Sequence, residues 1–512
     1  MLLEPVHLID EAATERLGAD IAMALVPGDL VCLSGEIGAG KSTLARALIR
    51  HLARDGELEV PSPTFTLCQR YELTPPVSHF DLYRLSTPGE MAELGFDEAL
   101  ASGAVLVEWP ERAGGELPAD ALTIRLDSGP GGGRLAHFSG GGEGSLAERL
   151  HRSLALRRFL DAYWDAAGER RFLQGDASAR RYETAHLAGE TRIVMDSPRR
   201  PDGPVIRDGK PYSRIAHLAE DVVPFLAVAE TLRAAGFAAP QVFARAVKDG
   251  FLLIEHLGEG RIVDANGVPI AGRYEDAARL LAAFHRHEWP REVTTGGDGG
   301  EALVHVIPRY DRMALSIEVS LLADWYAPRA LGRRLDEGER ADFDGIWAEL
   351  IGQVENSMPT LVMRDYHSPN IIWRCGEAFP QRLGLIDFQD AVIGPQAYDL
   401  ASLAQDARVD ISRSLERTLI EAYLAERRGE AQFDEAAFLR DYAILAAQRA
   451  SKILGIFIRL DERDGKPAYL AHLPRMREYL GRSLAHPALA RYRAWCEATI
   501  GIVAGQTPVI GA

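Results

Sequence analysis

The segment Gly35-Glu36-Ile37-Gly38-Ala39-Gly40-Lys41-Ser42-Thr43 decides the fold of the first part of the chain. It has the form GxxxxGK[ST], directly follows an apolar run at 29–34, and precedes a helical pattern that begins at about Ser42. Glycines allow backbone N–H groups to surround phosphate oxygens, and the start of a helix adds positive potential. The segment therefore predicts a nucleotide-binding P-loop whose binding residues are Gly35, Gly38, Ala39, Gly40, Lys41, Ser42 and Thr43.

The P-loop also predicts a metal site. Lys41 is expected to reach the β- and γ-phosphates, and the Ser42 hydroxyl is expected to bind Mg²⁺. The metal needs an acid at the end of a neighbouring strand. Asp81 follows the strand pattern at 77–80 and Glu108 follows that at 105–107, so both qualify. Because the guanine-reading motif NKxD does not occur, ATP is predicted rather than GTP.

Strand and helix patterns alternate over residues 1–110, which predicts a mostly parallel α/β sheet. Two strand patterns at 122–126 and 134–138 flank a glycine-rich turn and predict a β-hairpin that closes this domain. The glycine run at 140–144 is the predicted linker. The first domain is therefore expected to be an α/β P-loop NTPase domain over 1–144, and the second domain to span 145–512.

The second domain begins with a strongly helical pattern at 146–167. Strand patterns follow at 182–187, 191–195 and 251–254, with one helical pattern at 222–235, and helical patterns dominate beyond about 274. This order predicts a bilobal α+β fold of the protein-kinase type. Its small lobe is expected at about 155–265 and its helical lobe at about 266–512.

Size, charge and cysteine usage narrow the class of protein. A chain of 512 residues with 47% hydrophobic content is expected to form two or three domains. The net charge of −17 argues against sequence-independent nucleic-acid binding. The sequence shows no signal peptide and no uninterrupted apolar run of about 18 residues. A cytoplasmic protein without membrane association is expected, with reduced thiols at Cys32, Cys68, Cys375 and Cys496.

A second catalytic motif lies at 361–370, where Asp365 and Asn370 have the D-x-x-x-x-N spacing of a kinase catalytic loop. The carboxylate of Asp365 would accept the proton of the substrate hydroxyl, and Asn370 would bind Mg²⁺. The apolar run 382–386 leads to Asp387, at the position of a second Mg²⁺ ligand. His367 is expected to have a structural role, and Asp399 to be a buried carboxylate that supports the loop.

Several further motifs accompany the P-loop in order: Ser62-Pro63-Thr64-Phe65, His79-Phe80-Asp81-Leu82-Tyr83-Arg84, Glu93-Leu94-Gly95 and Val107-Glu108-Trp109-Pro110-Glu111-Arg112. With them, residues 6–140 resemble the TsaE family, the ATPase subunit of the bacterial tRNA threonylcarbamoyladenosine machinery. The resemblance implies Mg²⁺ ligation by Ser42 and Glu108, a mobile nucleotide-sensing loop at 62–65, and a catalytic role for Asp81. It also implies partners of the TsaD and TsaB type, with tRNA contacted only indirectly.

Residues 155–500 resemble the aminoglycoside phosphotransferase superfamily, with 175–182 at the position of its nucleotide-covering loop. Arg364-Asp365-Tyr366-His367-Ser368-Pro369-Asn370, Asp387-Phe388-Gln389-Asp390-Ala391, Gly394-Pro395 and Tyr398-Asp399 are similar to the AmgK branch. AmgK enzymes phosphorylate N-acetylmuramate and N-acetylglucosamine at the C1 hydroxyl in peptidoglycan recycling. Met363 departs from the usual His of the superfamily, and 191–196 lacks the phosphate-clamping lysine. Arg180 or Arg181 could replace it, although a solvated basic pair is the simpler interpretation.

Together these patterns predict a bifunctional protein that uses ATP and Mg²⁺ in both halves. Two alternatives remain open: the kinase half could act on an aminoglycoside or a choline-like molecule, or one half could serve only as a docking module. Aminoglycosides are polycations and require an acidic pocket, whereas amino sugars do not. The intact Lys41, Glu108, Asp365, Asn370 and Asp387 argue against a silent half.

Overall fold

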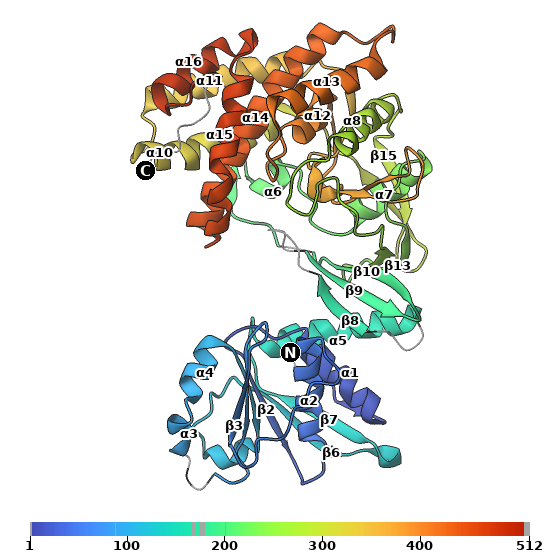
Figure 1. Cartoon of the computed structure of the whole chain (residues 1–512), viewed down its shortest axis with the longest axis vertical. Coiled ribbons are helices and arrows are strands. Elements are labelled where there is room, and N and C mark those ends of the chain that lie inside the picture. The colour runs from blue at the N-terminus through green and yellow to red at the C-terminus, as the bar shows by residue number, and fades with distance from the viewer. Residues whose placement is uncertain are drawn as a thin grey trace. The chain divides into compact units, whose positions relative to one another are not determined.

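The computed structural model describes residues 3–85, 87, 89–164, 169–173, 180–199 and 201–505. The chain divides into two compact units, Met1–Val194 and Met195–Ala512 (Figure 1). Residues 175–179 of the predicted nucleotide-covering loop lie outside the described residues. Within the described ranges, every helix is too short or too polar to cross a lipid bilayer.

The first unit is built on a seven-stranded sheet with the strand order β1-β7-β6-β2-β5-β4-β3. The four central strands β6, β2, β5 and β4 are parallel, and the outer strands β1, β7 and β3 pair antiparallel. The predicted parallel sheet and its closing hairpin are therefore confirmed. The strands are β1 (Val6–Leu8), β2 (Leu30–Gly35), β3 (Cys68–Tyr71), β4 (Val77–Asp81), β5 (Ala104–Glu108), β6 (Leu122–Ser128) and β7 (Arg134–Ser139).

Helices cover both faces of this sheet, which explains why residues 30–33 of β2 and 104–107 of β5 are continuous apolar runs. Leu17 of α1 and Leu44 of α2 belong to the core on one face. Met91 of α3 and Phe96 of α4 belong to the core on the other face. The helices of the unit are α1 (Glu11–Ala22), α2 (Lys41–Ala53), α3 (Glu90–Glu93), α4 (Phe96–Ser102) and α5 (Leu146–Tyr163).

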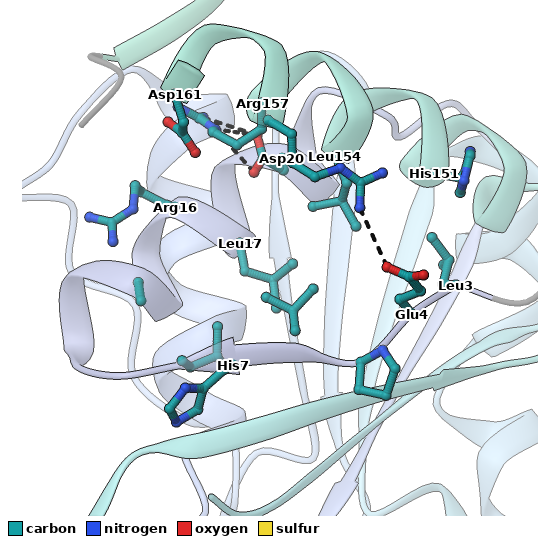
Figure 2. Close-up of a pocket in the computed structure, with 15 residues that line it drawn as sticks. Leu3, Glu4, His7, Arg16, Leu17, Asp20, His151, Leu154, Arg157 and Asp161 are labelled. Carbon is teal, nitrogen blue, oxygen red and sulfur yellow. Dashed lines mark hydrogen bonds and ion pairs between the residues drawn. The ribbon is translucent and has the colours of Figure 1, made fainter. Parts of the chain in front are cut away.

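A buried network of charges joins α5 and the next strand to α1. Asp20 of α1 is only 2% exposed and accepts hydrogen bonds from Arg157 of α5 at 2.9 Å (Figure 2) and from Arg170 at 2.7 Å. Arg170 also donates to Glu183 at 2.8 Å. Arg170 lies in β8 (Glu169–Leu173) and Glu183 in β9 (Arg181–Leu187), which pair antiparallel. Charges removed from water are tolerated only with such partners.

The glycine run predicted as the linker joins β7 to α5 inside the first unit. Its glycines at 140, 141 and 144 have positive φ, so the chain turns sharply there. The boundary between packing units lies at residue 194, within β10 (Glu190–Asp196). The packing boundary and the predicted domain boundary at 144 are therefore different positions, and the second stays a prediction.

The second unit is mainly helical, as the patterns beyond residue 274 predicted. Its helices are α6 (Tyr212–Ile215), α7 (Val223–Ala234), α8 (Ala271–His285), α9 (Arg312–Leu321), α10 (Ala327–Leu331), α11 (Glu337–Val354), α12 (Ala397–Ala404), α13 (Arg413–Arg427), α14 (Glu435–Glu462), α15 (Leu473–Ser483) and α16 (Ala490–Thr499). The long helix α14 packs against α9, α12 and α15.

Short antiparallel pairs of strands complete the second unit. They are β11 (Val205–Arg207) with β12 (Lys210–Pro211), β13 (Val242–Ala246) with β14 (Phe251–Glu255), β15 (Glu292–Gly296) with β16 (Ala302–Val306), β17 (Pro359–Val362) with β20 (Val392–Pro395), and β18 (Ile371–Trp373) with β19 (Leu383–Leu385). The last two pairs flank the predicted catalytic motif at 361–370.

The charge network around Asp20 generates the first testable prediction. Asp20→Asn leaves two buried guanidinium groups without their carboxylate, so it should lower the free energy of unfolding of the first unit by about 3–5 kcal/mol. Denaturant-induced unfolding measures this change. Glu4→Gln is the matched control, because Glu4 is 87% exposed and lies 3.9 Å from Arg158. The control should cost no more than about 1 kcal/mol, and equal effects of the two substitutions would contradict the prediction.

Candidate functional sites

The P-loop connects β2 to α2, as predicted. Gly35, Gly38 and Gly40 all have positive φ, and a Cβ at Gly35 would lie 2.5 Å from the carbonyl oxygen of Leu126. Only glycine fits there. The Lys41 ammonium donates to the carbonyl oxygens of Gly35 at 2.8 Å and Glu36 at 2.9 Å. The lysine is therefore held inside the loop, where phosphate oxygens would compete with two neutral carbonyls.

A tryptophan that the sequence analysis did not single out also holds Lys41. The Lys41 ammonium lies 3.6 Å from the centre of the Trp109 ring, a cation–π contact. Burial lowers the pKa of Lys41, while the charges of Glu108, Glu111 and Asp81 act in the opposite direction. Trp109 follows Glu108 directly and has a left-handed backbone conformation, with a φ of 62°.

Ser42 and Glu108, the predicted metal-binding pair, are in contact. The Ser42 hydroxyl donates to Glu108 Oε2 at 2.8 Å. The other carboxylate oxygen, Oε1, lies 3.0 Å from Nε2 of His79, and both side chains are buried. His79 lies on β4, beside β5 that carries Glu108. A buried carboxylate and a hydroxyl are hard oxygen donors, so this pair fits Mg²⁺.

Asp81 lies next to Glu108 in strand register but has different partners. Its Oδ2 accepts hydrogen bonds from Ser62 at 2.7 Å and Thr64 at 2.6 Å, and its Oδ1 accepts the backbone N–H of Tyr83 at 3.0 Å. Asp81 thus anchors the predicted nucleotide-sensing loop at 62–65. Phe65 at the end of this loop is 81% exposed. Glu108, not Asp81, is the acid in contact with Ser42.

Asp365 and Asn370 of the kinase-type motif lie between β17 and β18, and Asp387 follows β19. Asn370 Nδ2 is 3.0 Å from the backbone oxygen of Asp365 and 3.4 Å from Oδ2 of Asp387. Gln389 donates to the other oxygen of Asp387 at 2.8 Å. The structure therefore brings Asn370 and Asp387 together at one end of the catalytic loop. An amide and a carboxylate also fit Mg²⁺, which prefers oxygen ligands.

Asp365 has an open side chain and positive neighbours. Desolvation by the surrounding protein atoms raises the pKa of Asp365, whereas the charges of His367, Lys452 and Arg449 lower it. The net result is a pKa below the ordinary value of an aspartate. The side chain is exposed and lines a cavity of about 200 Å³. An ionised carboxylate at a cavity wall can accept a proton from a bound hydroxyl group.

Asp399 binds the backbone of the predicted catalytic loop, which confirms its expected role as a buried supporting carboxylate. Asp399 is fully buried, and its two oxygens accept the backbone N–H groups of Met363 at 2.7 Å and Arg364 at 2.9 Å. Burial raises the pKa of Asp399 to about 7, although these two hydrogen bonds oppose the shift. Met363 stands where the superfamily usually has His, and its contact with Asp399 is made by the backbone.

A charge cluster that the sequence analysis did not foresee supports the same loop. The buried carboxylate of Glu318, on α9, accepts hydrogen bonds from Arg364, Lys452 at 2.8 Å and Tyr310. Burial alone would raise the pKa of Glu318, but Lys452 and Arg364 lower it to about 2. Arg364 has a φ of 68°, so the backbone beside Asp365 adopts a left-handed conformation. The cluster fixes Arg364, the residue next to Asp365 in the chain.

Asp406 is a second buried acid that the sequence analysis missed. It accepts the backbone N–H of Ser368 at 2.8 Å and the hydroxyl of Tyr274 at 3.0 Å. The ring of His367 lies 3.7 Å from it. These contacts agree with a structural role for His367. Asp406 lies seven residues after Asp399, just beyond the end of α12. Its closeness in sequence to Asp399 was the only feature that could have pointed to a supporting role.

A larger cavity of about 700 Å³ lies in the first unit between β1, α1 and α5 (Figure 2). Arg16, Leu17, His151 and Arg158 are among the residues that line it. None of the predicted site residues lines it. The site assignment therefore depends on the two motifs and their contacts, and not on cavity size.

The two sites define a protein that joins a P-loop nucleotide-binding unit to a phosphotransferase of the protein-kinase type. Residues 8–134 match the family described as "Threonylcarbamoyl adenosine biosynthesis protein TsaE", and residues 169–439 match the "Phosphotransferase enzyme family". The chain belongs to both families, as a fusion of a TsaE domain with an aminoglycoside-phosphotransferase domain. It is therefore an enzyme that combines an ATPase domain with a phosphotransferase domain.

Relatives with known names cover the two halves separately. An N-acetylmuramate/N-acetylglucosamine kinase of Caulobacter vibrioides is 35% identical over 67% of this chain and 95% of its own length. A kinase of the same name from Pseudomonas aeruginosa is 33% identical over 62% of this chain and 84% of its own length. The tRNA threonylcarbamoyladenosine biosynthesis protein TsaE of Rickettsia felis is 34% identical over 32% of this chain and 96% of its own length.

The support of the catalytic loop by Asp399 can be tested directly. Asp399→Ala leaves two buried backbone N–H groups without an acceptor, so it should destabilise the second unit by about 2 kcal/mol or more and lower its phosphotransferase kcat. Denaturant unfolding and steady-state kinetics measure the two effects. Asp410→Ala is the control, because Asp410 is 83% exposed and pairs with Arg475. An unchanged kcat in folded Asp399→Ala protein would refute the support role.

Proposed function

We propose that the chain is bifunctional. Its TsaE domain hydrolyses ATP in support of tRNA threonylcarbamoyladenosine formation, and its kinase domain transfers phosphate from ATP to the C1 hydroxyl of N-acetylmuramate or N-acetylglucosamine. The observation that carries the proposal is the completeness of both motifs, each within a match that spans at least 95% of a named relative. The two matched regions, 8–134 and 169–439, lie on either side of the proposed domain boundary at 144.

In the TsaE domain, Lys41 exchanges the carbonyl oxygens of Gly35 and Glu36 for the β- and γ-phosphates of ATP. Ser42 and Glu108 hold Mg²⁺, and the hydrogen bond between them already places the two donors together. Mg²⁺ would neutralise phosphate charge and orient the γ-phosphate. Asp81 has a catalytic role through its link to the loop at 62–65.

The domain is proposed to act through protein partners of the TsaD and TsaB type, with tRNA contacted only by the assembly. The chain's net charge of −17 supports this indirect role, because direct tRNA binding requires a basic surface. The exposed Phe65 of the loop at 62–65 gives a partner an apolar contact next to the nucleotide site.

Separate nucleotide sites in the two domains lead to a prediction of independent activities. Lys41→Ala removes the ammonium that binds the phosphates, so it should abolish ATP hydrolysis by the TsaE domain and spare sugar phosphorylation. Asp365→Asn should do the reverse. ATPase assays with and without the partner proteins, together with sugar-kinase assays, measure both. Loss of both activities in folded Lys41→Ala protein would show that the halves share a site or are coupled.

In the kinase domain, Asp365 accepts the proton of the attacking hydroxyl, while Asn370 and Asp387 hold Mg²⁺ on the ATP phosphates. Mg²⁺ held by these two residues would offset the negative charge of the phosphates during transfer. The lowered pKa of Asp365 keeps this carboxylate ionised at neutral pH. Four cations, Arg364, Arg449, Lys452 and Arg459, and three carboxylates, Glu318, Asp365 and Asp390, line the cavity at Asp365. An amino-sugar acceptor is supported by the 35% identity to the N-acetylmuramate/N-acetylglucosamine kinase of Caulobacter vibrioides.

This assignment predicts a split between catalysis and nucleotide binding. Asp365→Asn should lower kcat about 10²–10⁴-fold and leave the Kd for ATP nearly unchanged, because the base orients the acceptor only. Asp387→Ala should weaken binding of Mg²⁺-ATP as well. Kinetics and nucleotide titrations separate the two effects. NMR of the product should show phosphate on the anomeric oxygen, whereas phosphate on O6, or turnover of kanamycin but of no amino sugar, would refute the proposed acceptor.

A further inference from the structure

The cavity at Asp365 has a cationic wall formed by one helix. Arg449, Lys452 and Arg459 of α14 line it, together with Ile453 and Ile456. Spacings of three, four and seven residues place side chains on one face of a helix. Arg459 lies seven residues, or about 10 Å along the helix, beyond Lys452. Asn370 and Asp387 are not among the lining residues, so the cavity lies beside the acceptor aspartate rather than at the metal pair.

The cations of this wall differ in how they are paired. Lys452 donates to the buried carboxylate of Glu318, and Arg449 donates to the backbone oxygen of Gln405 at 3.2 Å. Arg459 lies over the ring of Tyr212, with 5.3 Å between its guanidinium carbon and the ring centre. No carboxylate of the described chain lies within ion-pair distance of Arg459. Its Nε atom is buried and has no hydrogen-bond partner among the described residues.

An uncompensated guanidinium in a cavity is costly to the folded protein, because its charge is partly removed from water. Arginine keeps its charge under these conditions, so the cost is not relieved by deprotonation. A bound anion would relieve it. Guanidinium groups are planar and bind carboxylates through two parallel N–H donors, and the ring of Tyr212 lies beside this guanidinium. Ile453 and Ile456 supply an apolar surface between Arg459 and the cations nearer Asp365.

We propose that Arg459 is a carboxylate-binding residue that selects an acidic acceptor sugar. The inference rests on the proposed function, in which the acceptor is an N-acetylhexosamine whose C1 hydroxyl faces Asp365. N-acetylmuramate differs from N-acetylglucosamine by a lactyl ether on O3, which carries a carboxylate and a methyl group on the far side of the ring from C1. Arg459 binds this carboxylate, and Ile453 or Ile456 contacts the methyl group. N-acetylglucosamine leaves the subsite without an anion.

The test compares the two sugars in full-length wild-type protein and in Arg459→Gln. The kcat/KM for N-acetylmuramate relative to that for N-acetylglucosamine should fall about 10- to 100-fold in the variant, as expected for loss of a charge-assisted hydrogen bond. Most of the change should appear in KM. Calorimetric titration with N-acetylmuramate should show the same loss of affinity. Arg459→Lys should restore part of the ratio, because it returns the charge without the paired donors.

Arg463→Gln is the matched control, since Arg463 follows the same helix, pairs with Asp464 at 2.7 Å and does not line the cavity. The control should leave the ratio unchanged. An equal loss for both sugars in Arg459→Gln, or an unchanged ratio, would overturn the carboxylate subsite. If wild-type protein phosphorylates neither sugar, the proposed function itself fails. Activity on both sugars with an unaltered ratio in Arg459→Gln would leave that function standing and remove only the subsite.

Discussion

The carboxylate of Asp399 is shielded from water, and it satisfies the backbone N–H groups of Met363 and Arg364. The position of the catalytic loop depends on this arrangement, because a buried carboxylate must find its donors within the protein. The buried carboxylate of Glu318 likewise holds the side chain of Arg364 through an ion pair. The loop is thus held at its backbone by one buried acid and at its arginine by another. Asp365 lies between these supports and remains open to the cavity.

The first unit contains two further buried carboxylates that need donors within the protein. Glu108 is buried at the carboxyl end of β5 and is satisfied by Ser42 and His79. In the proposed function a metal ion replaces the hydrogen bond between Ser42 and Glu108, and both side chains then bind the metal. The Asp20 carboxylate is instead satisfied by Arg157 and Arg170, which are not replaceable by a ligand. One buried acid therefore serves the nucleotide site, while the other joins α5 and β8 to α1.

The cations at Asp365 bear on both catalysis and specificity. Although burial acts in the opposite direction, His367, Lys452 and Arg449 hold the pKa of Asp365 below its ordinary value, which keeps the proposed base ionised. An ionised base is a weaker proton acceptor, but phosphoryl transfer depends mainly on positioning and charge neutralisation. Cations and carboxylates both line this cavity, so in the proposed function individual side chains, rather than an overall field, select the acceptor.

The sequence alone determined the features whose residues lie close together along the chain. The P-loop, the alternating pattern around it and the D-x-x-x-x-N motif are local, so their residues, the parallel sheet and the support by Asp399 could be predicted. Asp20 and Arg170 are 150 residues apart, and Lys452 and Glu318 are 134 apart. No local pattern relates such residues, so the packing boundary at 194 and the cationic cavity wall emerged only in the tertiary structure. The partner of a buried charge is a group that lies close to it in space. Only the packing of distant helices and strands brings such groups together.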